Sequence, residues 1–487
     1  MTVDTQRPSG SGVEALNPNR WRALAVCLIA GFMTLLDVSI VNVALPSMQQ
    51  GLHAGPGAVS WVVSGYTLTF GLALVPAGKL GDTLGRKGFF LIGLALFTAV
   101  SLLCAVAPSP TWLVTARLLQ GAAGGLLGPQ VIGMIQQLFR GPERGRAFGL
   151  YGASIAVSTA VGPLAGGLLI QAAGRADGWR WVFLVNLPIG LIALLLGVTL
   201  LPKVPARRGN RGLDLVGVLL LGGGIACVLL PLVEQEQRSA VHWWLLGLAA
   251  VLLACFLGWE TLWRRTGRDP LVELSLLRSR SYSAGSALGV VYFAGYTGLI
   301  LVLTLYLQQG LHYSALEAGA ASLPFALGSA VSSTMGGRAV YRFGRVMVVV
   351  GLVSVTLGLA ATAVIVRYHS GSGVWLDILL PLLLVGLGSG LVIGPNQTLA
   401  LQGVPPERGG SASAVLQTGQ RIGTSLGTAV AATLFFNQLG ATGGDYAHAV
   451  SLSLYGAAAL VGVALLIGAA ELLVPRSTPA GGPSGTR

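Results

Sequence analysis

Long apolar runs separated by short polar connections make up most of the chain. A helix needs about 20 apolar residues to cross a bilayer, and backbone polar groups in hydrocarbon must bond one another. The pattern therefore predicts an all-α integral membrane protein with fourteen transmembrane helices. The predicted spans are residues 23–45, 59–78, 89–106, 112–135, 148–172, 181–201, 213–233, 243–262, 284–307, 318–336, 346–366, 375–401, 412–436 and 449–474.

Composition agrees with a bilayer environment. Of the 487 residues, 53% are hydrophobic and only 10% are charged, whereas soluble domains carry about 25% charged residues. The first apolar run is too long for the core of a signal peptide, so it is interpreted as the first span. The length leaves no room for a sizeable soluble domain.

Basic residues are distributed unevenly between the two sides of the predicted bundle. The net charge is +13, and most Lys and Arg fall in loops on one side, which the positive-inside rule makes cytoplasmic. This predicts cytoplasmic N- and C-termini in a multi-pass plasma-membrane protein. Because insertion explains the basic excess, no nucleic-acid partner is expected. The opposite loops hold only four basic residues, Arg175, Arg180, Arg238 and Arg367.

The longest polar connections divide the spans into six, two and six. The predicted parts are an N-terminal six-helix bundle at 1–206, two additional helices at 207–275, and a C-terminal six-helix bundle at 276–487. The final residues, 475–487, are rich in Pro, Gly, Ser and Thr and are expected to be disordered. Loops 78–87 and 336–345 follow the second span of each six and form a weak internal repeat.

Loop 78–87 combines glycines with charged residues in a regular pattern. The glycines permit a tight turn between two helices, and Asp82 can accept hydrogen bonds from a helix N-terminus. The two basic residues at its end are expected to anchor to lipid headgroups. The alternative is an ordinary basic loop, but we favour a gating loop. Its residues are Gly78, Gly81, Asp82, Gly85, Arg86 and Lys87.

Asp37 is the only carboxylate well inside a predicted span. Such a residue is costly in hydrocarbon and usually faces a cavity and carries function. We therefore predict that Asp37 couples transport to protons and reaches a cavity open to the outside; the alternative is a structural Asp bonded to a neighbouring helix. Arg117 shares a helix face with Gln120 and is a candidate partner, or alternatively a structural charge.

Further polar and small residues lie within other spans. Ser154, Ser158, Gly162 and Gly166 form a stripe that permits close helix contact. In the thirteenth span, polar residues near one face predict either a cavity surface or bonds between helices. Three tyrosines are added as possible cavity residues, although aromatics within spans more often only pack. The tentative cavity set is Tyr66, Gln120, Tyr292, Tyr296, Gln417, Gln420 and Arg421.

Five segments together carry a resemblance to a known family: 36–46, 78–87, 117–121, 162–167 and 179–188. The chain resembles the major facilitator superfamily, in its fourteen-span drug:proton antiporter branch. The resemblance implies two six-helix bundles around a central cavity plus two extra central helices, alternating access, and a role for Arg117 in proton coupling. It also implies an antiporter motif at Gly162, Pro163, Gly166 and Gly167.

Two positions depart from the family pattern. Ser39 stands where the family usually has Thr, which keeps the hydroxyl. The second-half loop, 337–345, lacks the acidic residue of the first-half loop. Any gating contact of that loop must therefore work differently.

The resulting functional prediction is a proton-coupled exporter of drugs or other small amphipathic molecules. The alternative is a substrate-specific metabolite exporter or a symporter on the same scaffold. A channel or membrane enzyme is disfavoured, because no repeated pore segment and no catalytic cluster is found. No P-loop for ATP is found either. We expect a monomer in lipid, without cofactor or metal, acting on small-molecule substrates and protons.

Substrate charge is constrained by the second six spans. No carboxylate lies deep within them, so divalent organic cations are not expected as substrates. Neutral, monocationic or mixed compounds are predicted instead.

Topology can be tested by cysteine labelling in a background without the four native cysteines. A single cysteine near Arg86 should not react with an impermeant maleimide in intact cells, whereas one near Arg238 should react. The opposite pattern would invert the predicted orientation.

Overall fold

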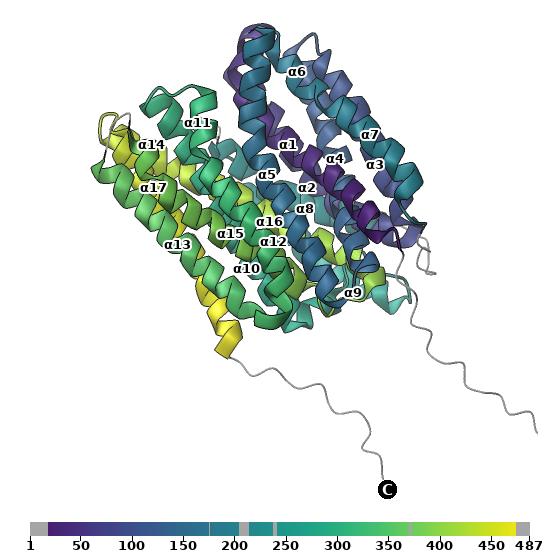
Figure 1. The fold of residues 1–487 in the computed structure, drawn as a ribbon. Coiled ribbons are helices and arrows are strands. Elements are labelled where there is room, and N and C mark those ends of the chain that lie inside the picture. Colours follow the sequence, from purple (N-terminus) through teal and green to yellow (C-terminus); the bar gives the residue numbers. More distant parts are fainter. Residues whose placement is uncertain (1–17, 175, 204–213, 237–240, 370–372, 474–487) are drawn as a thin grey trace, which may run out of the picture.

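The computed structural model describes residues 18–174, 176–203, 214–236, 241–369 and 373–473, and these form helices with short connections (Figure 1). Each of the fourteen predicted runs coincides with one helix or with two consecutive helices. The helices are α1 (Arg20–Leu52), α2 (Pro56–Leu84), α3 (Arg86–Ala105), α4 (Pro110–Leu138), α5 (Gly141–Ala173), α6 (Gly178–Leu184), α7 (Asn186–Leu200), α8 (Leu215–Glu236), α9 (Trp244–Arg265), η1 (Leu274–Arg278), α10 (Arg280–Leu305), η2 (Tyr306–Gly310), α11 (Ala315–Ala321), α12 (Leu323–Phe343), α13 (Arg345–Tyr368), α14 (Val374–Asp377), α15 (Leu379–Ala400), η3 (Pro406–Arg408), α16 (Gly409–Ala441) and α17 (Tyr446–Leu473). The predicted disordered tail, 475–487, lies outside the described residues.

Three of the predicted spans are each interrupted once near their start. The interruptions separate α6 from α7, α11 from α12, and α14 from α15. A proline lies within the first three residues of each second helix, and it lacks the N–H that would continue the preceding helix. These prolines are Pro188, Pro324 and Pro381.

Among the described residues, twelve helical segments are long and apolar enough to cross a membrane. The remaining two long helices, α12 and α16, are more polar. They are not peripheral: α12 packs against α5 and α15, and α16 packs against α2, α4 and α10. The polar helices therefore lie where the two halves of the chain meet, although α12 also carries exposed apolar residues such as Leu327 and Met335.

Glycines bring the two halves into close contact near the connection between α2 and α3, an end of the bundle that we call the gate end. A Cβ on Gly78 of α2 would lie 2.8 Å from the Cβ of Ala414 on α16. A Cβ on Gly149 of α5 would lie 2.9 Å from the Cα of Gly337 on α12. Figure 1 shows α5 running beside α12 along this seam. Larger residues at these positions would hold the halves apart.

Helices α8 and α9 pack on each other, and α8 also contacts α2 and α16. The segment after α9 folds back onto its end, where Leu271 N and Val272 N donate to Glu260 Oε1 at 3.0 and 3.2 Å. Asp214, just before α8, accepts from Trp259 Nε1 at 2.9 Å. The extra pair is thus attached to the helices that form the seam.

Close packing inside the C-terminal half predicts a stability difference between two helical glycines. A Cβ on Gly386 of α15 would lie only 2.9 Å from the Cα of Phe325, whereas a Cβ on Gly462 of α17 meets nothing within 4 Å. Gly386→Ala should cost about 1–3 kcal/mol through overpacking, while Gly462→Ala should be neutral or slightly stabilising. Thermal unfolding of the two purified variants measures the difference; equal melting temperatures would contradict it.

Candidate functional site

A fully buried ion pair lies at the centre of the N-terminal half. Arg117 Nη1 of α4 lies 2.5 Å from Asp37 Oδ2 of α1. The two side chains are 1% and 0% exposed. Gln120, one turn after Arg117, accepts from Arg117 Nη1 at 2.7 Å and donates to Asp37 Oδ1 at 3.1 Å. The structure thus brings together Asp37 and Arg117, which the sequence suggested as partners, with Gln120 on the same face of α4.

Two further residues complete this network. Asn186 Nδ2, in the first turn of α7, donates to Asp37 Oδ1 at 2.9 Å. Ser101 Oγ of α3 accepts from Gln120 Nε2 at 2.8 Å. Asn186 belongs to segment 179–188, one of the five segments that carry the family resemblance, so the sequence pointed to it. Ser101 lies in an apolar run with no such motif, so sequence reasoning missed it. Asp37 therefore accepts hydrogen bonds from two helices besides its own, α4 and α7, and Ser101 of α3 holds Gln120 in place.

Arg117 has partners on α2 as well. Its Nε donates to Val62 O at 2.9 Å, and its guanidinium lies 4.3 Å from the ring centre of Tyr66. Removing one member of such a pair would leave the other charge buried alone, which costs several kcal/mol. The expectation that Asp37 reaches an open cavity is wrong for this conformation, because its carboxylate is enclosed by protein.

Asp82 joins α2 to the start of α16 across the seam. It accepts from Gly410 N at 3.1 Å, and from Ser411 N and Ser411 Oγ at 2.8 Å each. It also lies 2.7 Å from Arg86 Nη2. The free amides and positive dipole end of α16 favour a carboxylate here. Asp82 lies 328 positions before Gly410 and 329 before Ser411, so the contact joins distant parts of the chain.

The other residues of loop 78–87 explain its pattern. Gly85 has φ +110°, which favours glycine, and a Cβ on Gly81 would lie 2.6 Å from Cδ of Gln130. Arg86 Nη2 donates to Pro406 O at 2.7 Å. Lys87 Nζ donates to Leu201 O at 2.6 Å. Arg86 is buried, so the expectation that it anchors to lipid headgroups is wrong; it binds the closed seam instead.

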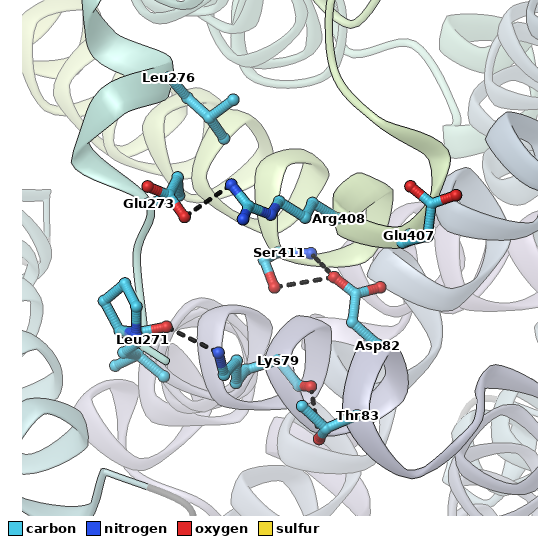
Figure 2. Close-up of a pocket in the computed structure, with 10 residues that line it drawn as sticks. Lys79, Asp82, Thr83, Leu271, Glu273, Leu276, Glu407, Arg408 and Ser411 are labelled. Atoms are coloured by element: carbon cyan, nitrogen blue, oxygen red, sulfur yellow. Dashed lines mark hydrogen bonds and ion pairs between the residues drawn. The ribbon is translucent and has the colours of Figure 1, made fainter. Parts of the chain in front are cut away.

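The segment after α9 adds contacts to both sides of this seam (Figure 2). Lys79 Nζ of α2 donates to Pro270 O at 2.8 Å. Glu273 lies 2.7 Å from Arg408 Nη1, just before α16. These residues line a small pocket together with Asp82 and Ser411. Separation of α2 from α16 must therefore break contacts of this segment as well as those of Asp82.

In the second half, the acidic partner comes from another helix. Arg345, at the start of α13, lies 2.6 Å from Glu471 Oε2 of α17 and donates to Asn396 Oδ1 of α15 at 2.5 Å. Loop 337–345 therefore needs no carboxylate of its own. The sequence difference between the two loops is compensated by Glu471 inside the C-terminal half.

The residues of the fifth-span motif face two different neighbours. A Cβ on Gly162 would lie 2.6 Å from the Cβ of Ser39 on α1, and Ser39 Oγ donates to Ser158 O at 3.0 Å. A Cβ on Gly166 would lie 3.0 Å from Cγ1 of Ile40, also on α1. The two glycines thus fix α5 closely against the helix that carries Asp37.

Pro163 and Gly167 point instead toward α11 of the other half. A Cβ on Gly319 of α11 would lie closest to the Cβ of Pro163. A Cβ on Gly167 would lie closest to the backbone of Leu316, also on α11. A capping box fixes the start of α11: Glu317 N donates to Ser314 Oγ at 3.2 Å. Hydrogen bonds from Ser314 to the carboxylate lower the pKa of Glu317. The motif therefore contacts both halves.

The tentative cavity residues separate into different places. Tyr292 and Tyr296 stack at 5.6 Å between ring centres, are buried in the core of the C-terminal half, and Tyr292 OH donates to Ser389 Oγ at 2.9 Å. They pack rather than line a shared site with Tyr66. Gln420 lies against Gly289 of α10.

Two residues of the tentative set approach the N-terminal half from α16. Gln417 lies against Gly128 of α4. The guanidinium of Arg421 lies 4.3 Å from the ring centre of Phe70 on α2. With Tyr66 on the same face of α2 as Phe70, these residues form a polar and aromatic group at the seam.

Comparisons with known proteins agree with this architecture. A family model described as Major Facilitator Superfamily matches residues 27–428. The chain is 38% identical over 441 residues to a protein named probable actinorhodin transporter of Streptomyces coelicolor, covering 89% of this chain and 76% of that protein. It is 32% identical over 445 residues to the tetracenomycin C resistance and export protein of Streptomyces glaucescens, covering 90% and 81%. The structure of a proton:xylose symporter superposes with TM-score 0.67 at 16% identity, covering 94% and 96%, which shows the fold alone.

The contacts of Asp82 predict a specific defect in a neutral variant. Asp82→Asn removes the charge that faces the start of α16 and pairs with Arg86, so closure at the gate end should weaken by about 1–3 kcal/mol. Substrate affinity should change little, while the transport rate should fall. Binding and transport assays in proteoliposomes separate the two quantities, with exposed Asp177→Asn as the control. Unchanged transport would contradict a gating role.

Proposed function

The chain belongs to the major facilitator superfamily, and on that premise we propose that it is a proton-coupled efflux transporter for drugs or other small amphipathic molecules. The observation that carries the proton coupling is the buried Asp37–Arg117 pair. A carboxylate kept inside a membrane bundle is a costly feature that transporters use for coupling. The relatives support the substrate class, since their names refer to an antibiotic transporter and to antibiotic export.

Protonation of Asp37 is the proposed switch. An ionised Asp37 attracts Arg117 and accepts from Asn186 and Gln120, which ties α1 to α4 and α7. A proton on Asp37 removes the negative charge that this arrangement requires, so the network must rearrange. Because both side chains are enclosed here, proton exchange requires another conformation of the cycle. Proton entry from outside and release inside would then drive the return step.

The available driving force is sufficient for concentrative export. One charge crossing 100 mV yields about 2.3 kcal/mol, and one pH unit adds about 1.4 kcal/mol. Together, about 3.7 kcal/mol can hold a neutral solute at a gradient of several hundredfold.

Alternating access follows from the two groups of contacts at the seam. With the gate end on the cytoplasmic side, as the basic residues predict, this conformation is closed toward the cytoplasm. Opening inward would separate Asp82 from Ser411 and Gly149 from Gly337. The bundles, divided as 1–206 and 276–487 around the extra pair at 207–275, would rock about a midplane site. The protein would act as a monomer in the plasma membrane with both termini cytoplasmic.

The rival proposal is a metabolite exporter or symporter on the same scaffold. Inside-out vesicles discriminate the direction: an antiporter accumulates substrate when the vesicle interior is acidified, whereas a symporter does not. The proximity of Gly162 and Gly166 to α1, together with the named relatives, favours the antiporter.

Asp37→Asn tests the coupling role. Asn preserves size and some hydrogen bonds, cannot release a proton, and should allow folding. We expect substrate binding to persist while uptake driven by a pH gradient in inside-out vesicles is lost. Asp177→Asn, on the surface, should behave like wild type. Transport at the wild-type rate with an unchanged pH profile would show that Asp37 is structural.

A further inference from the structure

Arg421 differs from the other interior arginines in having no anionic partner. Among the described residues, no hydrogen bond or ion pair involves its side chain, and its recorded contact is the ring of Phe70 at 4.3 Å. By contrast, Arg117 pairs with Asp37, and Arg345 pairs with Glu471. Arginine stays charged under all ordinary conditions. A charge kept in a membrane-spanning helix without a counter-charge usually serves function.

The surroundings of Arg421 are aromatic and contain an unsatisfied hydroxyl. Tyr66 is 1% exposed, and its OH is buried without a hydrogen-bond partner among the described residues. Its ring centre lies 4.3 Å from the guanidinium of Arg117 and 5.9 Å from the ring centre of Phe70. Next to Arg421 on α16, Thr418 Oγ1 is likewise buried and unpartnered. A cation, two hydroxyls and a flat apolar ring thus gather where α16 meets α2.

We infer that this group, namely Arg421, Phe70, Tyr66 and Thr418, recognises an acidic group on an aromatic substrate. A guanidinium binds a carboxylate with two parallel hydrogen bonds, and the free hydroxyl of Tyr66 is a donor suited to the same oxygen atoms. The substrate ring would pack beside Phe70. The nearby carboxylate of Asp37 does not compete, because Arg117 already neutralises it. The substrate class is therefore an amphipathic organic anion.

This inference rests on the proposed transport function and narrows its substrate class. The absence of deep carboxylates in the second half predicts neutral or monocationic substrates from the sequence alone. The unpaired cation at the seam changes that preference to acidic compounds, because a bound anion would supply the counter-charge that the described residues do not provide.

The test compares three probes that share one ring system: 9-anthracenecarboxylate, 9-anthracenecarboxamide and 9-(aminomethyl)anthracene. Binding to the purified full-length protein is measured by fluorescence at pH 7, where the first is an anion and the last a cation. The wild type should bind the carboxylate about tenfold or more tighter than the carboxamide, as expected for a charge-assisted hydrogen bond. The aminomethyl compound should bind weakest.

Variants identify the residue responsible. Arg421→Gln should remove the preference for the carboxylate and leave carboxamide binding unchanged, which also shows that the variant is folded. Arg421→Lys should retain part of the preference, since it keeps the charge but loses the planar fork. Arg265→Gln, at the exposed end of α9, is the matched control and should behave like wild type.

The outcomes separate this inference from the proposed function. Equal affinities for all three probes, a preference that survives in Arg421→Gln, or displacement of the carboxylate by chloride as effective as by aryl carboxylates would overturn the inference. Proton-driven uptake of the aminomethyl compound without the carboxylate preference would leave the transport function standing and refute the anion site. Arg421-dependent carboxylate binding without any pH-driven transport would support the anion site and refute the transport function.

Discussion

A charge inside a bilayer must be neutralised or bonded, and this requirement organises the interior of the molecule. Asp37 is held by Arg117 and Gln120 of α4 and by Asn186 of α7, so one network links α1, α4 and α7. The same rule explains why Arg345 is matched by Glu471 in the C-terminal half. Arg421 is the interior arginine for which the described chain supplies no such partner.

The two halves meet through close backbone contacts as well as through packed side chains. Glycines at Gly78, Gly149 and Gly337 let helices approach to contact distance, and the seam is then fixed by polar contacts at one end. At these glycine positions no side chain interdigitates between the helices. In the transport cycle proposed above, this seam would open repeatedly, and the Asp82 contact would act as an electrostatic latch on its closed state.

The extra pair of helices is part of this arrangement. The segment that follows α9 contacts α2 through Lys79 and the start of α16 through Arg408. Glu260 holds the same segment to the end of α9. A movement of α2 relative to α16 is consequently transmitted to α8 and α9, which gives the pair a mechanical connection to the gate besides their lipid contact.

The sequence by itself determined the helices and much of the chemistry. Apolar length specifies a spanning helix because hydrocarbon leaves the backbone no other partner, so all fourteen runs could be located, and a lone acid such as Asp37 stands out in them. Which side chains contact one another across the bundle could not be predicted from the sequence in this way. Ser101 and Glu471 find their partners through helix rotation and packing, which depend on contacts between residues far apart in the chain. For the same reason, only the tertiary structure decided that Tyr292 and Tyr296 pack in a core while Arg421 remains unpaired at the seam.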